Sequence, residues 1–296
     1  MHDPAILTQS LVKNYGAVQA LRGVNLEVRQ GEIFGFLGPN GAGKTTTIRC
    51  LLDLIRPSSG SARVFGLNPQ KESRKVRSLT GYLPGELRLE DAMTVETTLR
   101  YLNALRGGKA EWGYIQKLAK QLDLDLNIQA RNLSKGNKQK VGVVQALMHK
   151  PELLLLDEPT AGLDPLIQQE VLHLIAEANR DGATVFFSSH IISEVEQIAG
   201  KVAIIRQGVV VEVAETEMLV KRALRRVKVR FKEPQPATEL DDLPGVKLLN
   251  SDGAMVYFEI EGEMDALIKA LGKYPVSDFE TERPSLEEIF MAYYEI

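Results

Sequence analysis

The order of apolar and polar residues over about the first 215 positions predicts strands that alternate with helices. Residues 33–37 (IFGFL), 153–156 (LLLL) and 184–187 (TVFF) are short, nearly continuous apolar runs, which is typical of strands covered on both faces. Between these runs apolar residues recur every three or four positions, as over 166–179, which indicates amphipathic helices. This order favours an α/β fold with a mostly parallel sheet and helices on its faces.

Two further segments belong to the same predicted domain, which we place at residues 1–222. Residues 5–30 predict two N-terminal antiparallel strands around a turn, because apolar and polar residues alternate over 24–28. Residues 86–150 look mainly helical. We therefore expect a helical subdomain beside the sheet.

After about residue 222 the pattern changes, and a smaller domain is expected over 226–296. Apolar residues alternate with charges from Val227 to Phe231, and two apolar runs flank Ser251-Asp252-Gly253, a hairpin signal. The predicted β-α-β-β-α-β order suits a small ferredoxin-like α+β domain that ends in one more helix. The expected elements are strands near 246–249, 256–260 and 276–282, and helices near 263–272 and 285–295, the last opened by a capping box of Ser285 and Glu288.

Composition narrows the class of protein. The 296 residues are 44% apolar and 25% charged, as in a folded globular chain, and the formal net charge of −3 argues against nucleic acid as the main partner. Cys50 is the single cysteine, which fits a reducing compartment. No run approaches about 18 apolar residues, and the N-terminus does not resemble a signal peptide. A cytoplasmic location is expected, and any membrane span must come from another chain.

A glycine-rich loop between a strand and a helix carries the decisive motif. Residues 38–45 (GPNGAGKT) match G-x-x-x-x-G-K-[ST] and lie between a buried strand and an amphipathic helix, as a phosphate-binding loop requires. The alternative is a glycine turn that only joins the strand to the helix. Glycines let backbone N–H groups wrap around an anion, and the helix N-terminus adds its positive dipole. Lys44 is expected to reach the phosphates of ATP, and Thr45 to supply a hydroxyl to Mg²⁺. The expected nucleotide contacts are Gly38, Asn40, Gly41, Gly43, Lys44, Thr45 and Thr46.

Two carboxylates, Asp157 and Glu158, follow the apolar run at 153–156. In a doubly wound sheet, ligands bind at the carboxyl ends of the strands. Asp157 is expected to hold Mg²⁺ through water, and Glu158 to polarise the attacking water as general base. Two acids after an apolar run often mark only the return of the chain to solvent, but the phosphate loop favours the catalytic interpretation.

Four more motifs accompany the phosphate loop. They are Lys13-Asn14-Tyr15-Gly16, the signature motif Leu133-Ser134-Lys135-Gly136-Asn137, residues 157–165 (DEPTAGLDP) and Ser188-Ser189-His190. In this order, over residues 5–215, the motifs resemble those of ATPases of the ATP-binding-cassette (ABC) type, whose fold is a P-loop NTPase cassette. The tail from residue 226 resembles the accessory domain on ATPase subunits of bacterial ABC-2-type exporters.

The resemblance implies a site that a second subunit completes. Ser134 and Gly136, at the start of a helix, would touch the γ-phosphate of nucleotide held by a second copy or by a paralogous ATPase subunit. Two ATP molecules would then lie between the subunits of a two-fold dimer. His190 would contact the γ-phosphate and help to order the water and Glu158, and Tyr15 would stack on adenine. Without the resemblance, a lone histidine and a tyrosine would be read as ordinary surface or packed residues.

Two departures from the family pattern change these expectations. Lys135 stands where a second glycine is usual, and Asn137 where glutamine is common. In residues 81–86 (GYLPGE), Gly85 stands at the position of a usual glutamine. Either Glu86 replaces its contact with Mg²⁺, or this contact is missing.

The leading hypothesis is the ATP-hydrolysing motor of an exporter, bound to the inner face of the cell membrane through a separate permease. An alternative is a soluble ABC ATPase that acts on a ribosome or a DNA-associated partner. Such relatives usually carry two cassettes or a long coiled-coil insertion, and this chain shows one set of motifs. A cassette that binds ATP without turnover is disfavoured by Glu158 and His190. The sequence does not identify the cargo, because cargo would touch the permease.

Overall fold

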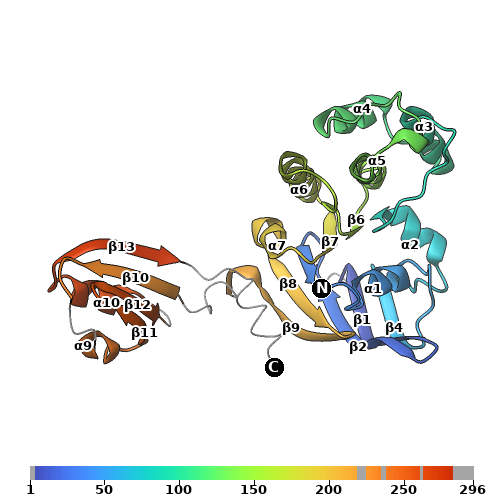
Figure 1. Ribbon diagram of the computed structural model, residues 1–296. Helices are drawn as coiled ribbons and strands as arrows, with labels where there is room; N and C mark the ends of the chain where they lie inside the picture. Colours follow the sequence, from blue (N-terminus) through green and yellow to red (C-terminus); the bar gives the residue numbers. More distant parts are fainter. Residues whose placement is uncertain (1–3, 219–224, 235–237, 261–262, 283–296) are drawn as a thin grey trace. The chain divides into compact units, whose positions relative to one another are not determined.

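The computed structural model describes residues 4–218, 225–234, 238–260 and 263–282. The chain forms two compact units, Met1–Ala214 and Glu215–Ile296 (Figure 1). The division of labour between domains at 1–222 and 226–296 stays a prediction.

A six-stranded sheet forms the centre of the first unit. Four neighbouring pairs of its strands run parallel, and the strands at 33–37, 153–157 and 184–189 are almost entirely buried. Long apolar side chains on both faces explain why these segments are central strands. The predicted mostly parallel sheet is therefore confirmed. In spatial order the strands are β5 (Thr80–Leu83), β6 (Leu153–Asp157), β7 (Thr184–Ser189), β3 (Ile33–Leu37), β8 (Lys201–Arg206) and β9 (Val209–Glu215).

A three-stranded antiparallel sheet packs against this core. It consists of β2 (Val18–Val28), β1 (Ile6–Tyr15) and β4 (Ser59–Val64), in that order. The hairpin of β1 and β2 confirms the two predicted N-terminal strands, whereas β4 was not predicted. One apolar cluster joins the two sheets, and it includes Ile6, Val24, Phe34, Phe36, Ile48, Leu51, Leu155 and Phe186.

The helices of the first unit begin at recognisable caps. The Thr94 and Ser134 hydroxyls and the Asp164 carboxylate each accept a hydrogen bond from a backbone N–H of the first helical turn. In Figure 1, α3, α4 and α5 lie together on the side of the unit away from β1, β2 and β4, which confirms the helical subdomain. The helices are α1 (Lys44–Leu51), α2 (Ser73–Leu79), α3 (Val95–Leu105), α4 (Trp112–Gln121), α5 (Lys135–Leu147), α6 (Pro165–Arg180) and α7 (Ile192–Ile198), with a 3₁₀ turn at Ala130–Asn132.

In its described residues, the second unit is a four-stranded antiparallel sheet with two helices. Its chain order is β10 (Arg225–Phe231), α9 (Thr238–Asp241), β11 (Val246–Asp252), β12 (Met255–Ile260), α10 (Asp265–Leu271) and β13 (Val276–Glu282). The spatial order β11-β12-β10-β13 with antiparallel neighbours is the ferredoxin-like arrangement that the sequence predicts. It has its own apolar core, which includes Val227, Val229, Phe231, Phe258, Ile260 and Leu267. The predicted helix at 285–295 lies outside the described residues.

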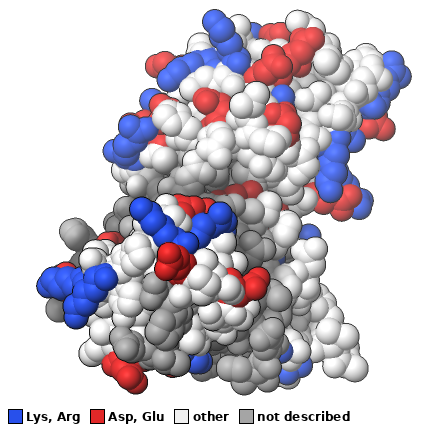
Figure 2. All heavy atoms as spheres, turned by 60° about the vertical axis from the view of Figure 1, so that its left-hand side comes forward, with Lys and Arg blue, Asp and Glu red and all other residues white. Residues whose placement is uncertain are grey.

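Charged side chains of both signs are mixed on the described surface. Figure 2 shows Lys and Arg side chains interspersed with Asp and Glu side chains over the described part of the visible face. Within the ranges that the structure describes, each helix is too short or too polar to cross a bilayer.

Candidate functional site

A cavity of about 170 Å³ lies over the glycine-rich loop and the start of α1. Gly41 and Gly43 have φ angles of 80° and 115°, which side-chain-bearing residues rarely adopt. A Cβ at Gly43 would lie 2.9 Å from the carbonyl oxygen of Ala20, so the close approach of this loop to β2 also requires glycine. The cavity is lined by Ala20, Pro39, Asn40, Gly41, Gly43, Lys44, Thr45, Thr46 and Glu158. It therefore gathers all the predicted phosphate contacts except Gly38.

Lys44 links this loop to the acidic end of β6. Its side chain is buried, and its Nζ donates to the carbonyl oxygens of Gly38 and, at 3.2 Å, Pro39. The same Nζ lies 3.0 Å from Glu158 Oε1. The other oxygen of Glu158, Oε2, lies 2.6 Å from Nδ1 of His190. Lys44, Glu158 and His190 thus form one continuous line of interacting groups, of which Lys44 and Glu158 line the cavity.

The end of β7 fixes the two carboxylates of β6. The backbone N–H of Glu158 donates to the Ser188 carbonyl oxygen at 3.2 Å and to Ser188 Oγ at 3.1 Å, and the Glu158 φ of 54° turns its side chain away from the strand. Asp157 is fully buried, and its Oδ1 accepts a hydrogen bond from Ser188 Oγ at 2.7 Å. Ser188 therefore holds the acidic pair in place through three contacts.

The second oxygen of Asp157 is suited to a hard cation. Within the described residues, Asp157 Oδ2 is buried and has no hydrogen-bond partner. A buried carboxylate oxygen without a partner is costly unless a cation or an ordered water meets it. Thr45 lines the cavity together with Glu158, the residue after Asp157, and carboxylate and hydroxyl oxygens are ligands that Mg²⁺ prefers. The residues present therefore fit a magnesium ion held beside nucleotide phosphates.

Comparisons with known proteins agree with this geometry. The family described as "ABC transporter" matches residues 21–161, and the "ATP-binding protein DrrA1-3-like, C-terminal domain" matches residues 219–294. The chain is 37% identical over 238 residues to the bacitracin transport ATP-binding protein BcrA of Bacillus licheniformis, covering 79% of this chain and 78% of that one. It is 35% identical to the linearmycin resistance ATP-binding protein LnrL of Bacillus subtilis, covering 68% and 66%.

A solved structure described as an ATP-binding subunit of an ABC transporter aligns with a TM-score of 0.67 and 30% identity, covering 73% of this chain and 91% of that chain. The chain belongs to the ABC transporter ATP-binding subunits. It is thus an ATPase of the ABC family that binds ATP, and its tail matches the DrrA1-3-like C-terminal domain. The resemblance drawn from the motifs is confirmed at the level of family, fold and enzyme class.

The signature motif of this ABC ATPase lies apart from its own phosphate loop. Ser134 Oγ accepts a hydrogen bond from the Asn137 N–H at 3.1 Å, and the residue is exposed at the start of α5. A Cβ at Gly136 would lie 2.8 Å from the Gly162 carbonyl oxygen, so the close approach of α5 to the loop after β6 requires glycine at this position. Neither Ser134 nor Gly136 lines the cavity around Lys44.

Tyr15, Gly85 and Glu86 lie outside the lining of the phosphate-loop cavity. The Tyr15 ring is 46% exposed, with Lys13 Nζ 5.1 Å from its centroid, and it does not line the cavity. A Cβ at Gly85 would lie 3.1 Å from Asp157 Oδ2, whereas the Glu86 side chain is 79% exposed and lies 4.0 Å from Arg88. Gly85, and not Glu86, is therefore the residue beside the buried carboxylate of Asp157 in this ABC ATPase.

Sequence reasoning missed several polar residues behind the ABC site. Gln139 Nε2 on α5 donates to the carbonyl oxygens of Glu158 and Pro159, at 2.8 and 3.0 Å. Ser188 holds both carboxylates, as described above. Glu194, on α7, accepts hydrogen bonds from two hydroxyl groups. The burial of Gln139 and Glu194 in the folded chain reveals their importance, and their sequence neighbourhood gives no comparable signal.

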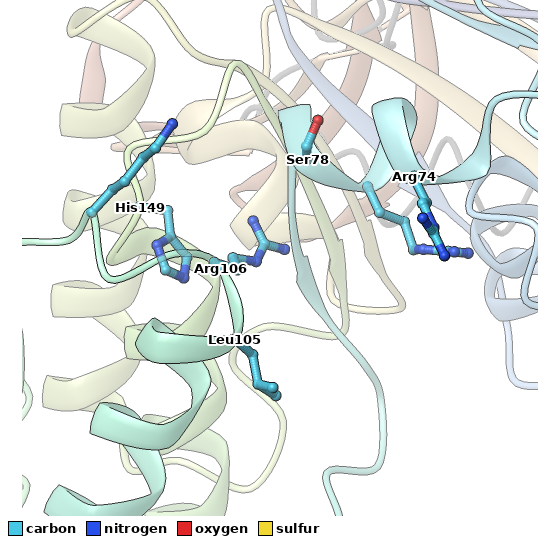
Figure 3. A pocket seen from close by; sticks show the side chains of 7 residues that line it. Arg74, Ser78, Leu105, Arg106 and His149 are labelled. Atoms are coloured by element: carbon cyan, nitrogen blue, oxygen red, sulfur yellow. The ribbon is translucent and has the colours of Figure 1, made fainter.

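A second cavity of the ABC unit, of about 570 Å³, lies between α2 and the ends of α3 and α5. We call it the basic pocket, and Figure 3 shows Arg106 and His149 next to one another, with Arg74 on α2 across the cavity. Burial, and then the charge of Arg106, lower the pKa of His149 to about 4, so its imidazole is neutral at pH 7. The lining residues are Arg74, Arg77, Ser78, Leu105, Arg106, Lys109 and His149.

The positive charge of the basic pocket is not neutralised within the described part of the chain. No carboxylate lines the pocket, and none of its three arginines or Lys109 takes part in an ion pair among the described residues. Arg77 and Arg106 donate instead to the backbone carbonyl oxygens of Leu52 and Thr80. The pocket is therefore suited to an anionic group from outside the described chain.

Proposed function

We propose that this ABC ATPase is the motor of an exporter, in which two subunits close around two Mg-ATP and drive a separate membrane permease. The observation that carries the catalytic part is the line Lys44–Glu158–His190 along the phosphate-loop cavity. Lys44 binds phosphate, Glu158 takes a proton from the attacking water, and His190 orients Glu158 and contacts the γ-phosphate. Asp157 and Thr45 hold Mg²⁺, which would neutralise charge that develops on the phosphates.

The position of the signature motif supports the dimer. The N-terminus of α5 is a ready anion site, because its first N–H groups and its dipole favour negative charge. Ser134 and Gly136 stand at this N-terminus but outside the chain's own phosphate cavity. A two-fold dimer brings the motif of each subunit to the nucleotide of the other, so neither site is complete in one subunit. Tyr15, exposed on β1, is the proposed platform for adenine.

The relatives support export and a permease partner. BcrA and LnrL are named for bacitracin transport and linearmycin resistance, and both are transporter ATP-binding proteins. We infer that the permease holds this subunit at the inner face of the cell membrane and contacts the cargo. The alternative, a soluble ABC ATPase acting on a ribosome or DNA-associated partner, finds no support among these relatives.

The basic pocket supports a specific mode of contact with that permease. Several cations without carboxylate partners surround a cavity whose rim includes Leu105, which is 66% exposed. A partner segment with carboxylates and an apolar side chain complements such a surface. Helix α2 leads directly into β5, and β5 leads to Gly85 beside Asp157. A partner bound in the basic pocket would therefore be connected to the nucleotide site through the single strand β5.

Reversing two charges of the basic pocket tests this proposal. We expect Arg74→Glu combined with Lys109→Glu to reduce co-purification with the membrane permease at least about tenfold, because like charges would then meet across the contact. ATP hydrolysis by the isolated subunit should stay unchanged. The matched control is Lys71→Glu, an exposed charge reversal just before α2 that does not line the pocket. Normal co-purification of the double variant would show that the pocket is not the contact.

Truncation after residue 222 tests the division of labour between the units. The first unit has its own core and holds the phosphate cavity, and the second has a separate apolar core. We expect the truncated chain to remain soluble and to bind ATP with an affinity within about threefold of the full chain. The lifetime of the ATP-bound dimer, or coupling to the permease, is expected to fall. A soluble, folded truncation that fails to bind ATP would show that the tail helps to form the site.

A further inference from the structure

Two loops flank the pair of Glu158 and His190, and one buried carboxylate touches both. The first loop, 158–163, follows β6. The second, which we count from Ser189 at the end of β7 to Ile191, leads into α7. Glu194 lies on α7 and is only 5% exposed. A carboxylate is rarely buried to this degree unless its oxygens are satisfied. None of the roles proposed above for phosphate, magnesium or water includes this residue.

Both oxygens of Glu194 accept hydrogen bonds, one from each loop. Thr160 Oγ1 donates to Oε1, and Ser189 Oγ donates to Oε2 at 2.7 Å. Thr160 and Ser189 are themselves buried, at 2% and 0% exposure. Ser189 Oγ also accepts the Ile191 N–H at 2.9 Å, so the turn after His190 belongs to the same network. Hydrogen bonds to a charged acceptor are about twice as strong as neutral ones, and their loss leaves a buried group unsatisfied.

The positions of these contacts relate Glu194 to the reacting groups. Thr160 is two residues after Glu158, and Ser189 immediately precedes His190. The 2.6 Å contact between Glu158 Oε2 and His190 Nδ1 therefore joins two loops that Glu194 ties together from behind. On the side of α5, Gln139 Nε2 holds the backbone of the first loop. The first loop is thus fixed from two helices, and its link to the histidine loop passes through Glu194.

We propose that Glu194 is a positioning residue, which sets the geometry of Glu158 and His190 by bridging the loops after β6 and β7. It touches neither nucleotide nor water. Its effect on rate rests on the proposed roles of Glu158 and His190, because a base and its orienting group that shift by about 1 Å lose on the order of a hundredfold in rate. Binding of ATP, which depends on the phosphate loop and α1, is not expected to depend on the bridge.

The test compares three variants on α7 in the full-length chain. Glu194→Ala removes the bridge, and we expect kcat for ATP hydrolysis to fall about 10- to 100-fold, with KM for ATP within about threefold of wild type. Glu194→Gln keeps the shape and still bridges, since its amide accepts from one hydroxyl and donates to the other, so most of kcat should return. Val195→Ala is the control for stability, because Val195 is fully buried and its side chain packs at Gly35 of β3.

A double-mutant cycle with Thr160→Val distinguishes positioning from a general loss of stability. Thr160→Val removes the bridging hydroxyl at nearly constant volume. If Glu194 acts through Thr160, the effects on kcat will not add, and the double variant will resemble Glu194→Ala. Thermal unfolding and ATP binding are measured for every variant. An unchanged kcat in Glu194→Ala, additive effects in the cycle, or an equal loss in Val195→Ala would each overturn the proposal.

Hydrolysis by Glu158→Gln, measured under the same conditions, distinguishes the proposed role of Glu158 as base from the proposed role of Glu194 as positioning residue. Normal hydrolysis in Glu158→Gln contradicts the proposed base itself. If Glu158→Gln loses hydrolysis while Glu194→Ala retains it, the base stands and only the positioning role is wrong.

Discussion

ATP hydrolysis is expected to fall about 10²- to 10⁴-fold when Glu158 is replaced by glutamine, because the carboxylate that takes the proton from water is lost. The amide has nearly the same shape, so the phosphate cavity, in which Lys44 Nζ lies 3.0 Å from Glu158 Oε1, should remain formed. ATP binding should stay within about threefold of wild type. Single-turnover hydrolysis and equilibrium nucleotide binding measure the two effects separately.

The same variant also tests the dimer. If hydrolysis is what opens the two-fold assembly, ATP should hold Glu158→Gln as a dimer that light scattering detects, while wild type returns to the monomer after turnover. The matched control is Glu152→Gln, because Glu152 is an exposed carboxylate directly before the opposite end of β6. Turnover at the wild-type rate by Glu158→Gln would remove Glu158 from the role of base.

The second large effect is expected for Lys44→Ala. The ammonium group of Lys44 is buried beside the phosphate loop, and a charge-assisted hydrogen bond of about 1.5–3 kcal/mol corresponds to roughly a 10- to 100-fold loss of ATP affinity. Hydrolysis should fall as well, since Glu158 Oε1 loses its cation partner. Isothermal titration with ATP measures the change in affinity.

Lys117→Ala provides the control for that measurement, because it removes an exposed lysine from α4, far along the chain from the phosphate loop. Wild-type affinity together with normal hydrolysis in Lys44→Ala would contradict the assignment of residues 38–45 as the phosphate cradle.

Local signals explain what could be predicted from the sequence. Phosphate binding depends on a short run of glycines, one lysine and a hydroxyl, and all of them are contiguous in residues 38–45. The buried strands at 33–37, 153–157 and 184–189 are nearly uniform in their apolar side chains, so their environment can be read from composition alone. The hairpin signal at 251–253 likewise lies within one short segment.

Elements decided by distant partners were missed. β4, Ser59–Val64, is polar and mostly exposed, and its first half has no strand pattern of its own. It becomes a strand because it pairs with β1, whose partner residues lie 47 to 58 positions earlier, from Val12↔Ser59 to Ile6↔Val64. Helix α1 ends at Leu51, although Ile55 continues the helical spacing of Ile48 and Leu51 in the sequence. Asp53 adopts a non-helical φ of 53°, and the chain turns there.

Polar residues that act from behind the site were missed for the same reason. Gln139 and Glu194 resemble ordinary polar positions on amphipathic helices. Only the packing of α5 and α7 against the loop after β6 buries them and gives them hydrogen-bond partners. The proposed roles of the site residues themselves remain predictions that the variants above will test.

The order of strands in the central sheet has a consequence for biosynthesis. β3 is the first of the six strands to leave the ribosome, yet its neighbours are β7 and β8, which begin at Thr184 and Lys201. At roughly 5–20 residues per second, these partners emerge on the order of ten seconds later. During this interval Phe34 and Phe36 belong to a strand with two unpaired edges, which is the kind of segment that associates with other chains. The nascent chain therefore needs protection from association with other chains through much of its translation, until β7 and β8 can pair with β3.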